Sequence, residues 1–163
     1  MTSILQAILI GTGATLFMDL YALILKLFNI KSLDYKFVGR WVGYFPKGKF
    51  SHHKIMASTP INHELLLGWI THYLIGITFA IFLVLAFGKK WLENPTLTPA
   101  LIIGIITIVG PFLLMQPAFG FGIAGSNLPD PNKARLMSLI THSVFGIGLY
   151  LSAMILNQIA KIL

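Results

Sequence analysis

Four polar side chains interrupt otherwise apolar stretches of this 163-residue chain: Asp19, His72, Gln116 and His142. A charged side chain inside a membrane costs about 2.5–3.5 kcal/mol on insertion scales, and such residues typically face a bundle interior where they bind ions or carry protons. The reference pKa of histidine, about 6.5, suits proton transfer near neutral pH. These residue types predict a polar layer that binds or translocates a small ligand, ion or proton.

The two histidines occupy the same place in a repeated motif. "ITHYLIGI" at 70–77 returns as "ITHSVFGI" at 140–147, and "GATLFMD" at 13–19 resembles "GPFLLMQ" at 110–116, which aligns Asp19 with Gln116. The matches predict a duplicated helix hairpin, with two parallel copies related by an axis along the membrane normal.

Small residues lie four positions before and after each histidine: Gly68, Gly76, Ser138 and Gly146. Positions four apart share a helix face, and small residues mark faces where membrane helices approach closely. Both imidazoles are therefore expected to point into the bundle. Asp19, on the adjoining helix, is the expected partner of His72. Gln116 could similarly pair with His142.

Two other interpretations of the same layer stay open. In one, His72 and His142 lie on diagonal helices and ligate haem axially, or they join Met18 and Met115 in a soft site for a transition metal such as Cu(I). In the other, the polar groups only hydrogen-bond helices together in a scaffold protein. The sequence does not identify the cofactor or the ligand.

The composition defines the elements that must position these residues. The chain is 56% hydrophobic and only 10% charged, against about 25% charged in ordinary globular domains. Four segments are long enough to cross a hydrocarbon core of about 30 Å: 3–29, 60–88, 98–119 and 131–160. We expect a single domain, 1–163, forming an all-α, up-down bundle of four transmembrane helices.

Local signals locate the helix ends. Thr59-Pro60, Thr98-Pro99 and Asp130-Pro131 each pair a capping residue with proline at the first helical position. Counting from these starts places His72 and His142 at similar depths, about 16–18 Å along their helices. Pro117 and the glycines at 120, 122 and 125 predict a break late in the third span.

The cations are sorted by side, which gives an orientation and argues against a nucleic-acid partner. One face carries nine lysines and arginines: Lys26, Lys31, Lys36, Arg40, Lys47, Lys49, Lys54, Lys133 and Arg135. The other has only Lys89, Lys90 and Lys161. Because cytoplasmic loops are enriched in Lys and Arg, the sequence places loops 30–59 and 120–131 in the cytoplasm and both termini outside.

The long loop interleaves aromatic and basic residues in "SLDYKFVGRWVGYFPKGKFSHHK" at 32–54. The helical spacing of its aromatic residues predicts a short amphipathic helix in the headgroup zone. Arg40, Lys47 and Lys49 are candidates for binding anionic lipid or phosphate. The nearby His52 and His53 are expected to be solvated, and the glycine spacing does not fit a nucleotide-binding Walker loop.

Enzyme activity is the less favoured class. The chain has no cysteine, no Ser-His-Asp order and no pair of clustered carboxylates. An intramembrane transferase using Asp34, Arg40 and the histidines is the remaining enzymatic alternative. Expected partners are membrane lipids and an unidentified small ligand or ion. Since one four-helix unit offers little room for a path, translocation would call for a homodimer.

The motifs "GATLFMDLYAL", "SLDYKFVGRWVGYFPKGKF", "GPFLLMQPAFGFGIAGS" and "THSVFGIGLYL" resemble a family of small bacterial inner-membrane proteins, the domain of unknown function numbered 2938. The resemblance covers essentially the whole chain, and the loop motif is its most specific part. It implies a four-helix protein of the bacterial inner membrane. It implies no activity, ligand or catalytic residue.

Overall fold

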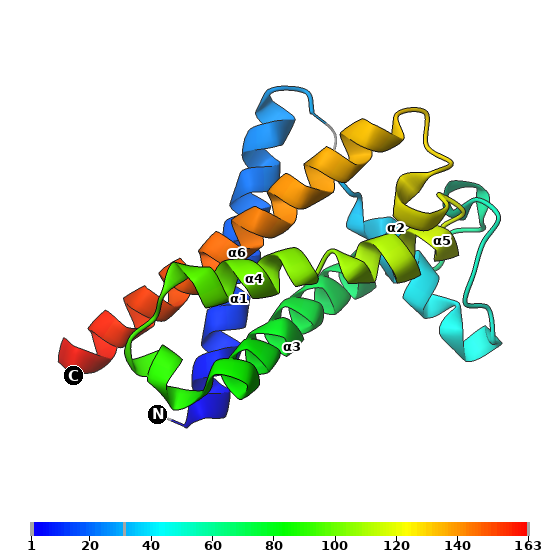
Figure 1. Cartoon of the computed structure of the whole chain (residues 1–163). Coiled ribbons are helices and arrows are strands. Elements are labelled where there is room, and N and C mark those ends of the chain that lie inside the picture. Colours follow the sequence, from blue (N-terminus) through cyan, green and yellow to red (C-terminus); the bar gives the residue numbers. More distant parts are fainter. Residues whose placement is uncertain (1, 31, 163) are drawn as a thin grey trace. The chain divides into compact units, whose positions relative to one another are not determined.

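The computed structural model describes residues 2–30 and 32–162. Lys31, which the charge count placed on the cytoplasmic face, lies outside these residues. The described part of the chain consists of helices and turns without strands, as the all-α prediction requires (Figure 1). Four helical stretches are long and apolar enough to cross a membrane: Ser3–Leu27, Glu64–Glu93, Leu97–Ala118 and Pro131–Lys161.

The long helices are α1 (Ser3–Leu27), α3 (Glu64–Glu93), α4 (Leu97–Ile106) and α6 (Pro131–Ile162). Beyond α4 the third span continues through a π-helical segment, η3 (Gly110–Met115), into the one-turn helix α5 (Gln116–Ala118). The loops hold α2 (Tyr35–Gly43) and the short 3-10 turns η1 (Phe45–Lys47), η2 (Ile55–Ala57) and η4 (Ile123–Gly125).

The chain divides into two compact units, which we describe separately. Unit 1 comprises residues 1–32, 73–107 and 140–163, and unit 2 comprises residues 33–72 and 108–139. Helices α3 and α6 contribute residues to both units.

Two of the three helix starts lie at other residues than the sequence predicted. Helix α6 begins at Pro131 as expected, and the Asp130 carboxylate accepts a hydrogen bond from the Lys133 amide at 3.1 Å. Helix α4 begins at Leu97, two residues before Pro99. Helix α3 begins at Glu64, four residues after Pro60, because His63 has a positive φ of 58°. His72 is therefore only eight residues from its helix start, and the depth estimated for it from Pro60 is too large by about 6 Å.

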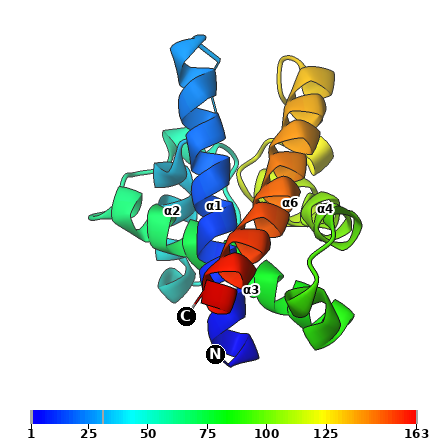
Figure 2. The same ribbon diagram turned by 90° about the vertical axis from the view of Figure 1, so that its left-hand side faces the viewer.

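Close helix crossings build unit 1. A Cβ on Gly148 of α6 would lie 3.0 Å from the Ala14 Cα of α1, and one on Gly104 of α4 would lie 2.6 Å from the Gly146 Cα of α6. The crossing of α1 (blue) and α6 (orange to red) is visible in Figure 1 and Figure 2. Beside these crossings lies a core of apolar side chains that includes Ile10, Leu83 and Leu149. Glycine and alanine thus permit the approach, as expected for helices that pack without a hydrophobic driving force between them.

Unit 2 is organised around α2 and the end of the third span. A Cβ on Gly39 would overlap the Glu64 carbonyl oxygen, so α2 lies directly against the start of α3. The segment before η2 pairs with the end of the third span, since the His52 amide donates to the Ala118 carbonyl at 2.7 Å and the Ile55 amide to the Phe119 carbonyl at 3.1 Å. Val38, Ile55, Ala118 and Phe119 form its buried apolar core.

The third span turns after Pro117 as predicted, but its irregular stretch begins about ten residues earlier than the proline and glycines indicated. The regular helix stops at Ile106, and the π-helical segment η3 holds Pro111 near its start. After Pro117 the chain turns, and the Gln116 carbonyl accepts hydrogen bonds from the amides of Phe119 and Phe121. Gly120 adopts φ 82°, and a Cβ there would overlap the carbonyl oxygen of His53. Only glycine fits this crossing of two backbones.

Candidate functional site

In unit 1, Asp19 is paired across two helices. The Tyr73 hydroxyl of α3 donates a hydrogen bond to Asp19 Oδ2 of α1 at 2.9 Å. Both side chains are half-buried, and both lie within spans long enough to cross the membrane. A carboxylate in that environment needs such a partner to offset desolvation. The sequence did not single out Tyr73, and its expectation that His72 also serves Asp19 stays a prediction.

A second polar pair in unit 1 joins α4 and α6. Thr107 Oγ1 donates to the Gly104 carbonyl at 2.5 Å, and Nδ1 of His142 lies 2.6 Å from the same Oγ1. The Thr107 hydroxyl therefore holds the His142 ring in place through its contact with Nδ1.

The two pairs lie at one level of unit 1. A Cβ on Gly13 would be 3.1 Å from the Ser152 Cβ, and one on Gly148 would be 3.0 Å from the Ala14 Cα, so α1 and α6 run antiparallel. Asp19 comes five residues after Ala14, and His142 comes six residues before Gly148. At 1.5 Å per residue both lie about 8–9 Å from this crossing along their own helices, on the same side of it.

In unit 2, His72 packs in an aromatic group. Its Nε2 is hydrogen-bonded to the Tyr35 hydroxyl at 2.9 Å, and the two rings are stacked with centroids 4.2 Å apart. Trp69 lies against Tyr35 at a centroid distance of 4.6 Å. Helix α2 supplies Tyr35, so the helix in the loop between the first two spans holds this imidazole.

Gln116 is buried in unit 2, with 8% of its surface exposed. Within the described residues its Oε1 has no hydrogen-bond partner. The Gln116 Oε1 lies 3.6 Å from the position that a Cβ on Gly125 would take, so the side chain is directed toward the turn after α5. The predicted layer of Asp19, His72, Gln116 and His142 draws on both units and stays a prediction.

Arg40 forms a buried ion pair with Glu64. Its Nε and Nη2 donate to the two carboxylate oxygens of Glu64 at 2.8 Å each, and its Nη1 donates to the carbonyls of Ile55 and Ser58. Only 5% of the Arg40 side chain is exposed. The bond to Glu64 is the main cause that raises the pKa of Arg40 above its usual value. The guanidinium donates to Glu64, Ile55 and Ser58 and is therefore engaged within the loop, whereas a lipid or phosphate ligand would need these donors.

His52 is buried, which the sequence did not suggest. It is 5% exposed, its Nδ1 lies 2.7 Å from Ser58 Oγ, and its Nε2 has no partner within the described residues. Burial, followed by the charges of Lys49 and Arg40, lowers the pKa of His52 below its usual value. The imidazole is therefore neutral at pH 7. The expectation that His52 is solvated is wrong, because its backbone pairs with Ala118, far away in the sequence.

Lys47 and Lys49 behave as surface cations. Both are exposed, and their Nζ atoms lie 5.3 Å and 5.2 Å from the centroid of the Tyr44 ring. Their exposed position is compatible with the predicted binding of anionic lipid or phosphate.

The metal interpretation stays a prediction. Among the described residues no three His, Asp or Glu side chains come together as a metal site would require. Met18 packs against the apolar core of unit 1 and Met115 against that of unit 2. Hydrogen bonds already engage Nε2 of His72 and Nδ1 of His142. A metal or haem iron would have to take the opposite ring nitrogens or displace Tyr35 and Thr107.

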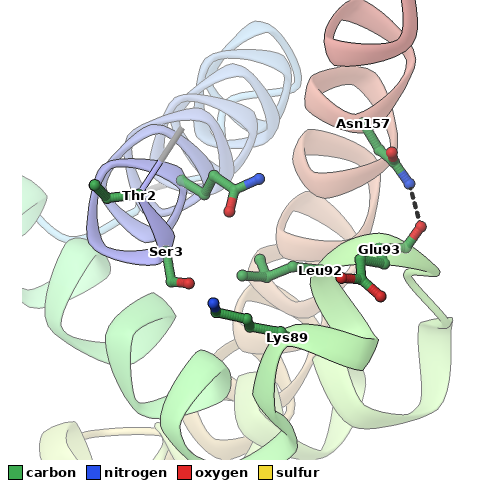
Figure 3. Close-up of a pocket in the computed structure, with 7 residues that line it drawn as sticks. Thr2, Ser3, Lys89, Leu92, Glu93 and Asn157 are labelled. Carbon is green, nitrogen blue, oxygen red and sulfur yellow. Dashed lines mark hydrogen bonds between the residues drawn. The ribbon is translucent and has the colours of Figure 1, made fainter.

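One pocket of unit 1 was not anticipated from the sequence. It has a volume of about 300 Å³ and lies among the ends of α1, α3 and α6 (Figure 3), where it is lined by Thr2, Ser3, Gln6, Lys89, Leu92, Glu93 and Asn157. Asn157 Nδ2 donates to the Glu93 carbonyl at 2.5 Å. Figure 3 shows the Lys89 ammonium and the Ser3 hydroxyl directed toward each other. The pocket is polar and lies at helix ends, away from the mid-span pairs.

These features define a multi-pass, all-helical membrane protein whose spans contain hydrogen-bonded titratable side chains. The chain belongs to the family described as "Protein of unknown function (DUF2938)", whose sequence profile matches residues 8–156. Searches among curated proteins and among solved structures gave no match.

Proposed function

We propose that the protein binds a small ion, a proton or a small polar solute at the Asp19–Tyr73 and Thr107–His142 pairs and passes it across the membrane. The observation that carries the proposal is the placement of a carboxylate and an imidazole at one level of unit 1, each hydrogen-bonded to a neighbouring helix. Close glycine contacts already hold these helices together. Costly ionisable groups are not needed for packing there, which supports a functional role.

The two pairs suit proton-linked chemistry. Tyr73 donates a hydrogen bond to Asp19, and Thr107 is hydrogen-bonded to His142, whose protonation would convert an acceptor nitrogen into a donor. One acid and one base of this kind can release a proton when a cation binds in its place, or can pass a proton to or from a bound protic solute. His72 and Gln116, in unit 2, stay the predicted further members of the layer.

We further propose that the protein lies in the bacterial inner membrane with loops 30–59 and 120–131 in the cytoplasm. The nine-to-three distribution of Lys and Arg supports this orientation. The family resemblance supports the bacterial inner membrane. A homodimer is the proposed transporting assembly.

The test is flux through liposomes that contain the purified protein and a trapped pH-sensitive dye, under an imposed pH gradient. Asp19→Asn and His142→Gln should each lower the flux by tenfold or more, equivalent to about 1.4 kcal/mol. Tyr73→Phe removes one hydroxyl and should have a smaller effect. Asp130→Asn is the matched control, because it also removes one carboxylate but keeps a good N-cap at an exposed position.

If Asp19→Asn and His142→Gln insert normally and transport like the unaltered protein, the pairs serve only to hold helices together. A visible absorption spectrum and elemental analysis of the same preparation test the haem and metal interpretation. A Soret band or stoichiometric metal would replace the proton-linked proposal by a redox one.

A further inference from the structure

The long loop of unit 2 carries exposed lysines that form no ion pair within the described residues. Between Asp34 and Glu64 the chain has five Lys or Arg residues and no acid other than these two ends. Asp34 pairs with Lys36 at 2.9 Å, and Glu64 pairs with Arg40 at 2.8 Å. Lys47, Lys49 and Lys54 are left, and all three are exposed.

The fold brings two of these lysines onto one aromatic ring. The Tyr44 ring is held by its hydroxyl, which donates to the Thr59 carbonyl at 3.0 Å. Gly48, with φ 68°, reverses the chain between Lys47 and Lys49, so that both ammonium groups lie within 5.3 Å of the ring centroid. Attraction to the ring offsets part of the repulsion between the two charges. A bound anion would offset the rest.

Apolar side chains beside the lysines fit the membrane surface. Phe50 is 61% exposed, although its carbonyl is fixed by a hydrogen bond of 2.7 Å from the Trp41 indole. An exposed phenylalanine next to exposed lysines is typical of a segment at the boundary between headgroups and acyl chains. The Arg40–Glu64 ion pair also ties this loop to the first residue of α3, one of the helices long enough to cross a membrane.

We propose that Lys47 and Lys49, arranged around Tyr44 and beside Phe50, form a binding site for the phosphate headgroup of anionic membrane lipids. The lysines contact the headgroup charge, and Phe50 enters the acyl boundary. Lys54 adds attraction without a defined contact. The site is independent of the proposed intramembrane function, because all its residues lie in unit 2 and outside the spans.

His52 offers an internal reporter of this site. The Lys49 charge contributes to the lowered pKa of His52, together with burial and Arg40. The other groups packed around the imidazole are Ser58 and the Tyr44 ring, whose centroid is 5.0 Å away. An anion bound to Lys49 weakens the effect of that charge. Lipid binding is therefore expected to raise the pKa of His52.

The first experiment measures lipid retention by the full chain in detergent, using native mass spectrometry with phosphatidylglycerol and phosphatidylcholine. The unaltered protein should prefer phosphatidylglycerol. The double variant Lys47→Gln/Lys49→Gln should lower that preference by roughly tenfold to thirtyfold, since each lysine near an anionic surface contributes about fivefold. Lys89→Gln/Lys90→Gln, which removes two adjacent exposed lysines elsewhere, is the matched control and should retain the preference.

Two outcomes overturn the proposal. One is a Lys47→Gln/Lys49→Gln variant that retains phosphatidylglycerol as well as the control. The other is full displacement of the lipid by excess inorganic phosphate, which would mark a site for a soluble anion. In a second experiment, histidine NMR in nanodiscs should show a higher pKa for His52 with phosphatidylglycerol than with phosphatidylcholine. Equal values would also contradict the site.

Discussion

At the scale of single residues, the structure separates ionic groups that hold the fold from those available to a ligand. Arg40 uses both sides of its guanidinium, one for Glu64 and one for two backbone carbonyls of the loop. Within the described residues, Lys47 and Lys49 form no ion pair with an acid, and both are exposed. Arginine and lysine in one basic loop thus have different roles, because only the planar guanidinium satisfies several fixed acceptors at once.

This distinction predicts unequal costs for removing two similar-looking acids. Glu64→Gln leaves the buried Arg40 charge uncompensated and should lower the free energy of unfolding by about 3–5 kcal/mol. Asp34→Asn removes the partner of Lys36 in a pair whose side chains are 43% and 44% exposed, and should cost less than about 1 kcal/mol. Asparagine also preserves the N-cap of α2.

Thermal unfolding in detergent, followed by tryptophan fluorescence, measures both variants. Trp41 packs against Phe119 and therefore reports on unit 2. Equal midpoints for the two variants would show that the Arg40–Glu64 pair contributes no more than a surface ion pair.

At the scale of elements, glycine positions decide how closely the helices approach and hence where the polar pairs lie. Gly104 lies against α6 at a point where a Cβ would come within 2.6 Å of the His142 carbonyl oxygen and of the Gly146 Cα. Thr107, one turn later on the same span, contacts the His142 ring. The α4–α6 contact and the Thr107–His142 pair therefore depend on each other.

Gly104→Ala should separate α4 from α6 and weaken the Thr107–His142 hydrogen bond. The obstructing atoms are backbone, which cannot rotate away, so we expect a loss of about 1–3 kcal/mol in stability together with reduced flux. Gly110→Ala is the control in the same span, because among the described residues no heavy atom outside its own helical stretch lies within 4 Å of its Cβ position. Unfolding and liposome flux measure both variants, and similar behaviour of the two would refute the coupling.

At the scale of the whole molecule, composition and apolar length predicted the number of spans, and Asp130-Pro131 predicted the start of α6. The start of α3 was missed because the left-handed backbone at His63 depends on loop packing, which a proline signal does not reveal. The buried His52 and the Arg40–Glu64 pair depend on contacts between distant residues. Tyr73 and Thr107 were missed because hydroxyl side chains are common in apolar segments and carry no distinctive pattern.

The charge distribution gives the last prediction, the orientation in the membrane. Nine Lys and Arg residues against three are expected to keep the basic loops in the cytoplasm. A reporter that is active only outside the cytoplasm should therefore work when fused after Leu163, and should be silent when inserted at Gly48, which is exposed and has no heavy atom within 4 Å of its Cβ position. Lys47→Gln/Lys49→Gln leaves seven against three and should preserve this pattern, so that its lipid phenotype is separable from topology. The reverse reporter pattern would place the proposed lipid site on the outer leaflet and contradict the orientation.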